Sequence, residues 1–182
     1  NVFPPAGFEI VNADNSYTWE LNTAVGGYGL SSQCSYIRGF DYWPGGDVDD
    51  MRISVNTNNM YDTKLVFDVA YARYAVNYSD TLEVLASTDC GETLQRVYYK
   101  GGTDLSTAPD YSADAWVPAA SEWRTDTVDL TAFENNNDVM LVFRSITGWG
   151  QHVYLDNINL LTTNTTAIAE TKKDETVLML YP

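Results

Sequence analysis

An aspartate and an asparagine interrupt a hydrophobic segment near the C-terminal end of the sequence. In residues 153–160 (VYLDNINL) the apolar alternation runs up to Leu155 and resumes on the opposite phase at Ile158. Because successive side chains of a strand point to opposite faces, this shift predicts either a β-bulge or a strand buried on both faces with Asp156 pointing inward. Both arrangements give Asp156 a specific role.

A buried carboxylate needs hydrogen-bond donors, a counter-charge or a metal ion, because leaving it alone costs roughly several kcal/mol. No lysine or arginine lies near Asp156 in the sequence. The segment therefore suggests a site for a hard cation such as calcium, which prefers oxygen ligands. The alternative is a polar residue at a strand end that is capped by backbone amides.

A second acidic segment, residues 41–50 (DYWPGGDVDD), places four carboxylates, including Asp41 and Asp47, around a flexible turn. A cation or solvent would relieve the repulsion between these like charges, and both alternatives remain open. The spacing is not that of an EF-hand, because several positions that need oxygen ligands hold other residue types. Asp14, in an Asp-Asn-Ser turn, is a third and weaker candidate.

Catalytic motifs are absent from the sequence. There is no His-Glu-x-x-His, no Gly-x-Ser-x-Gly and no phosphate-binding glycine loop, and the single histidine, His152, has no serine or cysteine partner nearby in sequence. Chance pairs among the 25 acidic residues leave an acidic-pair hydrolase as a minor alternative. We expect a protein that is not an enzyme.

Hydrophobic patterns of period two dominate the chain, and turn-like residues separate them at short intervals. We expect strands at 35–42, 51–55, 63–74, 80–87, 93–100, 122–130 and 139–145, with one helical turn at 131–134. Segment 63–74 is apolar on both phases, so it should be a central strand covered on both sides. Many short strands of this kind predict an all-β fold, an antiparallel sandwich or barrel.

Length and charge limit the remaining possibilities. The 182 residues fit one domain, or one domain with a tail. The formal net charge of −15 disfavours nucleic acid and anionic membranes as partners, and no apolar run is long enough for membrane insertion. The sequence opens on NVFPP without a signal peptide, so we expect it to begin inside a longer protein.

The composition also raises two questions about single residue types. Cys34 and Cys90 permit one disulfide, and two unrelated buried thiols are the alternative. The tryptophans at 43, 116, 123 and 149 look exposed, and sugar rings stack on flat aromatic faces, which makes carbohydrate binding a hypothesis. Packing of these rings into the core is the alternative. The four candidate ligand-binding residues are Trp43, Trp116, Trp123 and Trp149.

Four segments, in this order, resemble a known family. They are 65–74 (LVFDVAYARY), 80–91 (DTLEVLASTDCG), 123–130 (WRTDTVDL) and 154–158 (YLDNI). They are similar to the cleaved-adhesin or choice-of-anchor J modules of secreted Bacteroidetes proteins, which follow the catalytic domain of cytophagalysin-like metalloproteases and, more distantly, occur in gingipain adhesin regions. The resemblance covers nearly all of residues 1–161.

The resemblance implies a β-jelly-roll sandwich, related to MAM and carbohydrate-binding modules, with a structural calcium ion (Ca2+) near the chain ends. In the family pattern the ligands come from a Phe-Glu-Asn start, a loop that matches Asp41 and its neighbours, and an aspartate of the terminal strand. Asn1 matches the asparagine of that start, so its glutamate would lie just upstream. The candidate ligands are Asp156, Asp41, Asp47, Asp14 and Asn1.

The C-terminal part is expected to be separate from the module. Residues 1–161 should form the jelly roll, the polar residues 162–176 a linker, and residues 177–182 the first strand of a further domain. The ending Tyr181-Pro182 resembles the start of a type IX secretion sorting domain. That resemblance implies a secreted or cell-surface attached protein, and the oxidising route favours a Cys34–Cys90 disulfide.

The function implied by these features is a non-catalytic, calcium-stabilised accessory or adhesion module of a larger secreted hydrolase, a metalloprotease by the family resemblance. Its expected partners are the catalytic domain of the same parent chain and a protein or polysaccharide surface. The alternative is a carbohydrate-binding module that recognises a polysaccharide through exposed aromatic residues.

Overall fold

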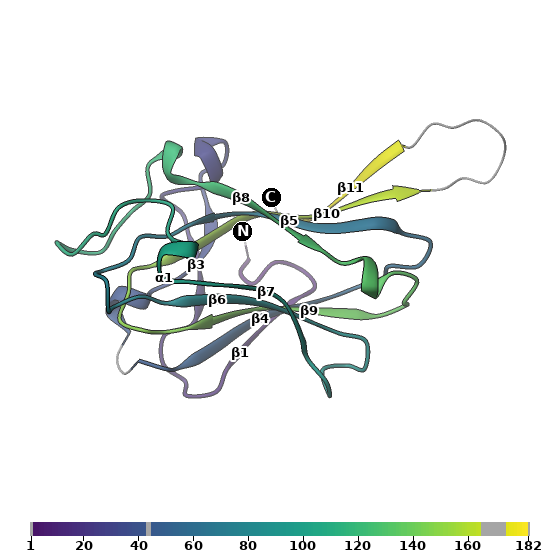
Figure 1. Cartoon of the computed structure of the whole chain (residues 1–182), viewed down its shortest axis with the longest axis horizontal. Coiled ribbons are helices and arrows are strands. Elements are labelled where there is room, and N and C mark those ends of the chain that lie inside the picture. Colours follow the sequence, from purple (N-terminus) through teal and green to yellow (C-terminus); the bar gives the residue numbers. More distant parts are fainter. Residues whose placement is uncertain (1, 43–44, 165–173, 182) are drawn as a thin grey trace.

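Two antiparallel β-sheets stack face to face, as Figure 1 shows. The computed structural model describes residues 2–42, 45–164 and 174–181. The strands are β1 (Phe8–Asn12), β2 (Trp19–Asn22), β3 (Cys34–Ile37), β4 (Val48–Val55), β5 (Tyr61–Ala70), β6 (Thr81–Ser87), β7 (Gln95–Gly101), β8 (Arg124–Asp129), β9 (Val139–Ile146), β10 (Val153–Asn164) and β11 (Asp174–Tyr181). One short helix, α1 (Gly102–Leu105), and 3-10 turns at Gly27–Gly29, Gly39–Asp41, Ala120–Glu122 and Thr131–Phe133 complete the list.

The strand order confirms the predicted antiparallel β-sandwich. One sheet runs β1-β4-β9-β6-β7 and the other β2-β3-β10-β5-β8, with β11 paired to β10. Consecutive strands therefore often lie in different sheets, which is how jelly-roll chains cross between layers. No helix in the described residues is long and apolar enough to cross a membrane.

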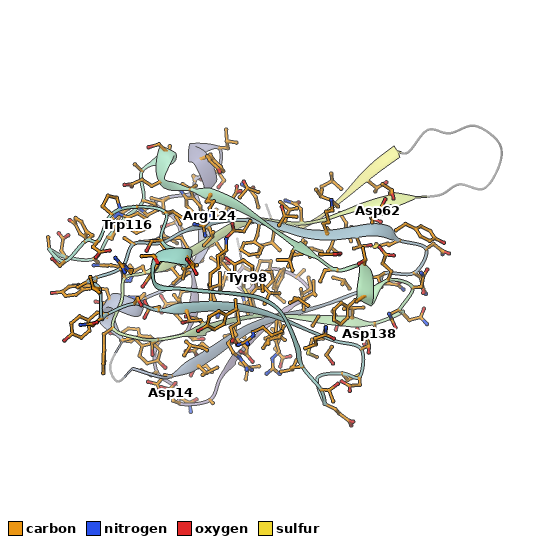
Figure 2. All side chains as sticks on the ribbon, in the orientation of Figure 1. Asp14, Asp62, Tyr98, Trp116, Arg124 and Asp138 are labelled. Carbon is orange, nitrogen blue, oxygen red and sulfur yellow. The ribbon has the colours of Figure 1, made fainter. Side chains whose placement is uncertain are left out.

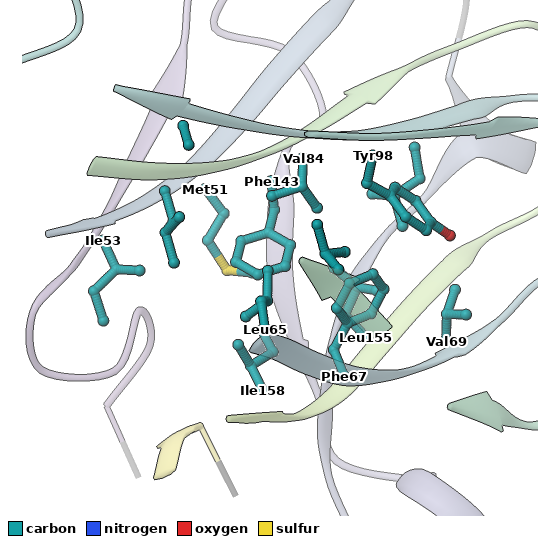
Figure 3. Close-up of a cluster of buried hydrophobic side chains, with 14 of the residues drawn as sticks. Met51, Ile53, Leu65, Phe67, Val69, Val84, Tyr98, Phe143, Leu155 and Ile158 are labelled. Carbon is teal, nitrogen blue, oxygen red and sulfur yellow. The ribbon is translucent and has the colours of Figure 1, made fainter. Parts of the chain in front are cut away.

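The main hydrophobic core lies between the two sheets (Figure 3). Phe67 of β5 packs edge to face against Phe143 of β9, with ring centroids 5.7 Å apart, and against Tyr98 of β7 at 5.4 Å. Leu155 and Ile158 of β10 fill the same layer and are fully buried. Truncating a buried aromatic ring of this kind typically costs about 3 to 5 kcal/mol.

A second cluster covers the outer face of the sheet that contains β5 and β10. Ala70, Ala72 and Tyr154 point away from the main core and pack with Trp116 and Trp123, which lie in the segment between α1 and β8. The prediction that the strand of segment 63–74 is covered on both sides is therefore confirmed, although β5 itself ends at Ala70.

The shift of hydrophobic phase at Asp156 is a β-bulge, and the strand is also covered on both faces. Asp156 pairs with Asp68, and the next partner pair is Asn159 with Val66, so two residues of β10 face the single residue between them on β5. Asn157 adopts a positive φ of 48° to make this step. The bulge returns Ile158 to the inter-sheet core.

Strand β10 continues beyond the expected end of the module. It runs to Asn164, and β11 pairs with it antiparallel from Ile158 onward, forming the hairpin that extends from the sandwich in Figure 1. The expected linker 162–176 therefore has strand residues at both of its ends, and its middle part, 165–173, lies outside the described residues. The division into a module, a linker and a further domain stays a prediction.

Most of the predicted strands are present, with shifted ends. The strand expected over 35–42 is shorter, because Gly39–Asp41 forms a 3-10 turn after β3. Glycine is required at position 39, because a Cβ atom there would lie 2.5 Å from the Gln151 carbonyl oxygen. The short strands β1 and β2 were not predicted, and the helical turn expected at 131–134 is observed as Thr131–Phe133.

Candidate functional site

Asp156 is fully buried and its carboxylate is surrounded by hydrogen-bond donors. Its Oδ2 accepts bonds of 2.5 Å from both the Gly27 backbone N–H and the Ser31 hydroxyl, and its Oδ1 accepts the Asn157 N–H at 2.8 Å. Three donors satisfy most of the acceptor positions of this carboxylate, so its burial does not require a cation. The geometry of Asp156 fits a latch that holds loop 23–33 against β10, and its role as a calcium ligand stays a prediction.

The side chains expected to share a calcium ion with Asp156 do not meet it. Asp41 pairs with Arg38 at 2.8 Å, and Asp14 accepts a 2.7 Å hydrogen bond from the Tyr42 hydroxyl. No group of three His, Cys, Asp or Glu side chains within the described residues is placed to hold a metal ion. Asn1 lies outside the described residues.

Asp49 at the start of β4 has a more unusual environment than any of the expected ligands. It is fully buried, and neither carboxylate oxygen has a hydrogen-bond partner. Burial and the nearby charges of Asp14 and Asp47 raise the pKa of Asp49 to about 6. The nearby hydroxyls of Thr18 and Tyr42 favour the charged carboxylate and oppose this rise. The Oδ2 of Asp47 and the Oγ1 of Thr18 are also buried without a partner.

Sequence reasoning did not select Asp49, although a signal was available. Asp49 lies on the same phase of β4 as Met51, Ile53 and Val55, which all belong to the inter-sheet core. A carboxylate on a core-facing phase is the pattern that drew attention to Asp156. The neighbouring side chains that affect Asp49 are Thr18, Tyr42, Asp14 and Asp47, and each presents an oxygen atom. Oxygen ligands are those that calcium prefers.

An aromatic pocket lies at the end of the sandwich where three loops meet. The cavity has a volume of about 390 Å³. Ring centroids of Phe40 and Tyr74 are 6.3 Å apart, and those of Tyr74 and Tyr78 are 6.1 Å apart. Trp149 continues this row at 6.1 Å from Tyr78. The lining residues are Gly39, Phe40, Tyr42, Tyr74, Tyr78, Trp149 and Gly150.

Asp80 fixes the loop that carries Trp149. Its Oδ1 accepts hydrogen bonds from the backbone N–H groups of Gly148 at 2.6 Å and of Gly150 at 3.2 Å. Gly148 must be glycine, because a Cβ atom there would lie 2.1 Å from the Ser79 carbonyl oxygen. Trp149 itself has a positive φ of 62°, and its side chain remains 41% exposed.

The carboxylate of Asp80 lies behind the pocket and is itself 1% exposed. Burial raises its pKa to about 6, and the two glycine N–H groups and the Tyr71 hydroxyl oppose that shift. The second oxygen, Oδ2, is buried without a hydrogen-bond partner. No sequence pattern pointed to Asp80, since its neighbours Gly148 and Gly150 are about 70 residues away in the chain.

Of the four tryptophans expected to be exposed, only Trp149 is shown to be accessible in the described residues. Trp116 and Trp123 are 6% and 5% exposed, so the expectation that their rings are exposed is wrong. They are buried because Tyr154 packs against both rings on the outer face of the sheet. Figure 2 marks the position of Trp116 on the ribbon. Trp43 lies outside the described residues.

The expected Cys34–Cys90 disulfide is not formed, since both thiols are free. Cys34 is buried at the start of β3 in the outer aromatic cluster, whereas Cys90 is exposed in the turn between β6 and β7 of the opposite sheet. The sequence pattern could not reveal that separation, because it does not assign strands to sheets.

His152 is not placed for catalysis. Its side chain is buried among aromatic rings, including Tyr36 and Phe40, and burial lowers its pKa to about 4. Its nearest acidic neighbour is Asp41, whose Oδ2 lies 3.9 Å from Nε2. A neutral imidazole packed between rings supports the structure.

Comparisons with known proteins support the fold and no closer relationship. No family model matches the chain, and no curated protein matches it. Among solved structures, the K2 cleaved adhesin domain of Lys-gingipain is 18% identical with a TM-score of 0.55, covering 87% of this chain and 91% of that chain. The K3 domain from Porphyromonas gingivalis W83 is 17% identical with a TM-score of 0.55, covering 86% and 92%.

Carbohydrate-binding modules are similar to the same extent. One from the β-sandwich superfamily is 13% identical with a TM-score of 0.56, and the match covers 85% of this chain but only 57% of that one. Another, solved with β-1,4-galactotriose, is 8% identical with a TM-score of 0.55, covering 86% and 89%. The chain thus has the β-sandwich fold that adhesin and carbohydrate-binding modules share.

Proposed function

We propose that this protein is a non-catalytic binding module that attaches to a glycan through the aromatic pocket. The observation that carries the proposal is the row of rings from Phe40 to Trp149 around a cavity open to solvent. Sugar rings stack on aromatic faces, and a cavity of this volume lies within the usual range for small-ligand sites. The resemblance of the fold to carbohydrate-binding modules supports the same function.

The test is affinity electrophoresis against a panel of soluble polysaccharides, followed by titration with the best ligand. Trp149→Ala should weaken binding at least about tenfold, since it removes the largest ring of the pocket, which is 41% exposed. Tyr99→Ala is the matched control, because Tyr99 is 56% exposed on β7 and does not line the pocket. Retardation by no polysaccharide, or equal losses in both variants, would reject the pocket as a glycan site.

We propose further that the module serves a larger secreted hydrolase, a metalloprotease by the family resemblance, and that it is secreted or attached to the cell surface through a type IX sorting domain. The motifs of segments 65–74 and 80–91 and the ending Tyr181-Pro182 support this assignment. Hydrolysis of casein or of a glycan by the purified chain, abolished by a point substitution within it, would contradict a non-catalytic role.

Calcium stabilisation remains part of the proposal, with Asp49 in place of Asp156 at its centre. Two carboxylates and one hydroxyl would contribute there, since no three acidic side chains of the described residues are placed around one ion. Asp49, Asp47 and Thr18 supply buried oxygen atoms without partners, and Asp14 lies close enough to affect the charge of Asp49. A calcium ion there would neutralise the repulsion between these carboxylates. Because Asp14 also accepts a hydrogen bond from the hydroxyl of Tyr42, which lines the pocket, the same ion would support the binding site.

A further inference from the structure

We infer that the pocket prefers a glycan whose sugar carries a protonated amino group over its neutral counterpart. This inference rests on the proposed function, since it specifies the ligand of the same pocket. It combines three features of the described residues: a buried carboxylate behind the pocket floor, a lining of aromatic rings without a basic side chain, and a strongly negative molecule.

The buried carboxylate is that of Asp80, and two glycines that line the cavity lie against it. A Cβ atom on Gly39 would lie 2.6 Å from the Asp80 Oδ2, and one on Gly150 would lie 2.5 Å from it. Both glycines line the pocket. The absence of side chains at these two positions therefore allows the carboxylate to lie directly behind the backbone of the pocket wall.

The charge of Asp80 is not neutralised by a basic residue. None of the ion pairs among the described residues includes it, and its Oδ1 accepts only backbone N–H groups while its Oδ2 has no partner. A charge held in surroundings of low dielectric acts over longer distances than a solvated charge. A cation in the pocket would therefore gain more from Asp80 than from a surface aspartate.

The lining adds a second attraction for a cation. The faces of tryptophan and tyrosine rings attract ammonium groups, because the ring face carries negative charge. The arginines next to lining residues in sequence, Arg38 and Arg73, are held by Asp41 and Asp110 at 2.8 Å. They therefore do not contribute an unpaired positive charge that would repel an amine.

The net charge of −15 also favours a cationic ligand while it approaches the molecule. It disfavours sulfated or carboxylated glycans and favours cationic ones, and salt weakens both effects. A neutral sugar would gain only the stacking interaction. An amino sugar would gain stacking and two electrostatic contributions.

The test compares three trisaccharides with the same β-1,4 linkage, which differ at carbon 2 of each ring. These are the trimers of glucosamine, of N-acetylglucosamine and of glucose, titrated at pH 7 in low salt by calorimetry. We expect the glucosamine trimer to bind about tenfold more tightly than either neutral trimer. In 0.5 M NaCl this preference should fall severalfold, whereas the affinity for the neutral trimers should change little.

A substitution locates the source of the preference. Asp80→Asn keeps an oxygen that can accept the N–H groups of Gly148 and Gly150, and it removes the negative charge. We expect the ratio of the affinity for the glucosamine trimer to the affinity for the neutral trimers to fall severalfold. Asp138→Asn is the control for loss of one charge, since Asp138 is exposed just before β9, at the opposite end of that strand from the Trp149 loop (Figure 2).

The outcomes separate the inference from the proposed function. Equal affinities for the three trimers, or tighter binding of a neutral one, would overturn the inference and leave glycan binding intact. The same holds if none of the three binds while another polysaccharide does. If no glycan binds, both fail. Should Asp80→Asn not fold, the comparison of ligands and its salt dependence still decide the question.

Discussion

Asp49, Asp80 and Asp156 are all buried without a lysine or arginine partner in the described residues, yet their surroundings differ. Asp156 is satisfied by three donors and acts as a structural latch. Asp80 is satisfied at one oxygen and holds the Trp149 loop. Asp49 has the hydroxyls of Thr18 and Tyr42 nearby but no partner at hydrogen-bond geometry on either oxygen, which makes it the group that would gain most from a cation.

Replacing Asp49 should show the cost of its buried charge. Its pKa of about 6 in the folded protein is above the usual 3.8, so the folded state holds the proton more tightly. The resulting destabilisation is absent below about pH 4 and complete above about pH 6. With a chelator at pH 7, Asp49→Asn should therefore be more stable than the wild type, by about 1 to 3 kcal/mol. Urea denaturation across this pH range measures the difference.

Calcium should reverse the order of stability. We expect millimolar calcium to raise the melting temperature of the wild type and to leave Asp49→Asn unchanged. Asp156→Asn is the matched control, and calcium should still stabilise it. If calcium shifts the melting temperature of none of the three proteins, the proposed metal site does not exist; if only Asp156→Asn loses the shift, the site lies at Asp156.

The two thiols should differ in reactivity. Cys90 is exposed, whereas burial, with the charge of Asp156 nearby, raises the pKa of Cys34 above its ordinary value. We expect a thiol reagent to modify one cysteine per chain in the native protein and two after denaturation. Peptide mass mapping should place the native modification at Cys90. Protection of both thiols until a reductant is added would instead demonstrate a disulfide.

Strand β10 connects the pocket loop that carries Trp149 with loop 23–33. It begins directly after the loop that carries Trp149, and its bulge at Asp156 and Asn157 anchors loop 23–33. The bulge is stabilised by a 2.7 Å hydrogen bond from the Asn157 Nδ2 to the Asp68 Oδ2. Since Asn157 has a positive φ, a residue with a branched Cβ is strained there.

Substitutions in the bulge should destabilise the protein without a calcium dependence. Asp156→Ala leaves the Gly27 N–H and the Ser31 hydroxyl without their acceptor, which should cost about 2 to 4 kcal/mol. Ser31→Ala removes one donor only and should cost about 1 kcal/mol. Chemical denaturation with and without chelator measures both values. A loss in Asp156→Ala that appears only when calcium is present would contradict the role of a latch.

The strands that were predicted correctly are those with a sustained pattern. β5, β6 and β9 carry apolar residues on a clear phase, and that phase follows from burial against the opposite sheet. β1 and β2 have five and four residues, and most of their side chains are only partly buried. Too few buried positions remain in such short strands for a period to be visible.

The surface of the whole molecule carries an excess of negative charge that should affect both stability and binding. With a net charge of −15, mutual repulsion destabilises the folded chain at low ionic strength. We expect 0.3 M NaCl to raise the melting temperature by about a few degrees at pH 7. Near the isoelectric point of about 4.1 the same salt should have little effect. A melting temperature that falls with salt at pH 7 would show that attractive ion pairs dominate.

The amino-acid sequence was sufficient for the fold class, the central strand, the phase shift at Asp156 and the solvent-accessible Trp149, because these depend on local periodicity and turn chemistry. The three loops of the pocket, the separation of Cys34 from Cys90, and the burial of Trp116 and Trp123 depend on which strands share a sheet and on what packs against each face. The tertiary structure alone brings Asp80 behind the pocket floor and Asp14 beside Asp49, since residues far apart in the chain become neighbours only when the two sheets close around the core.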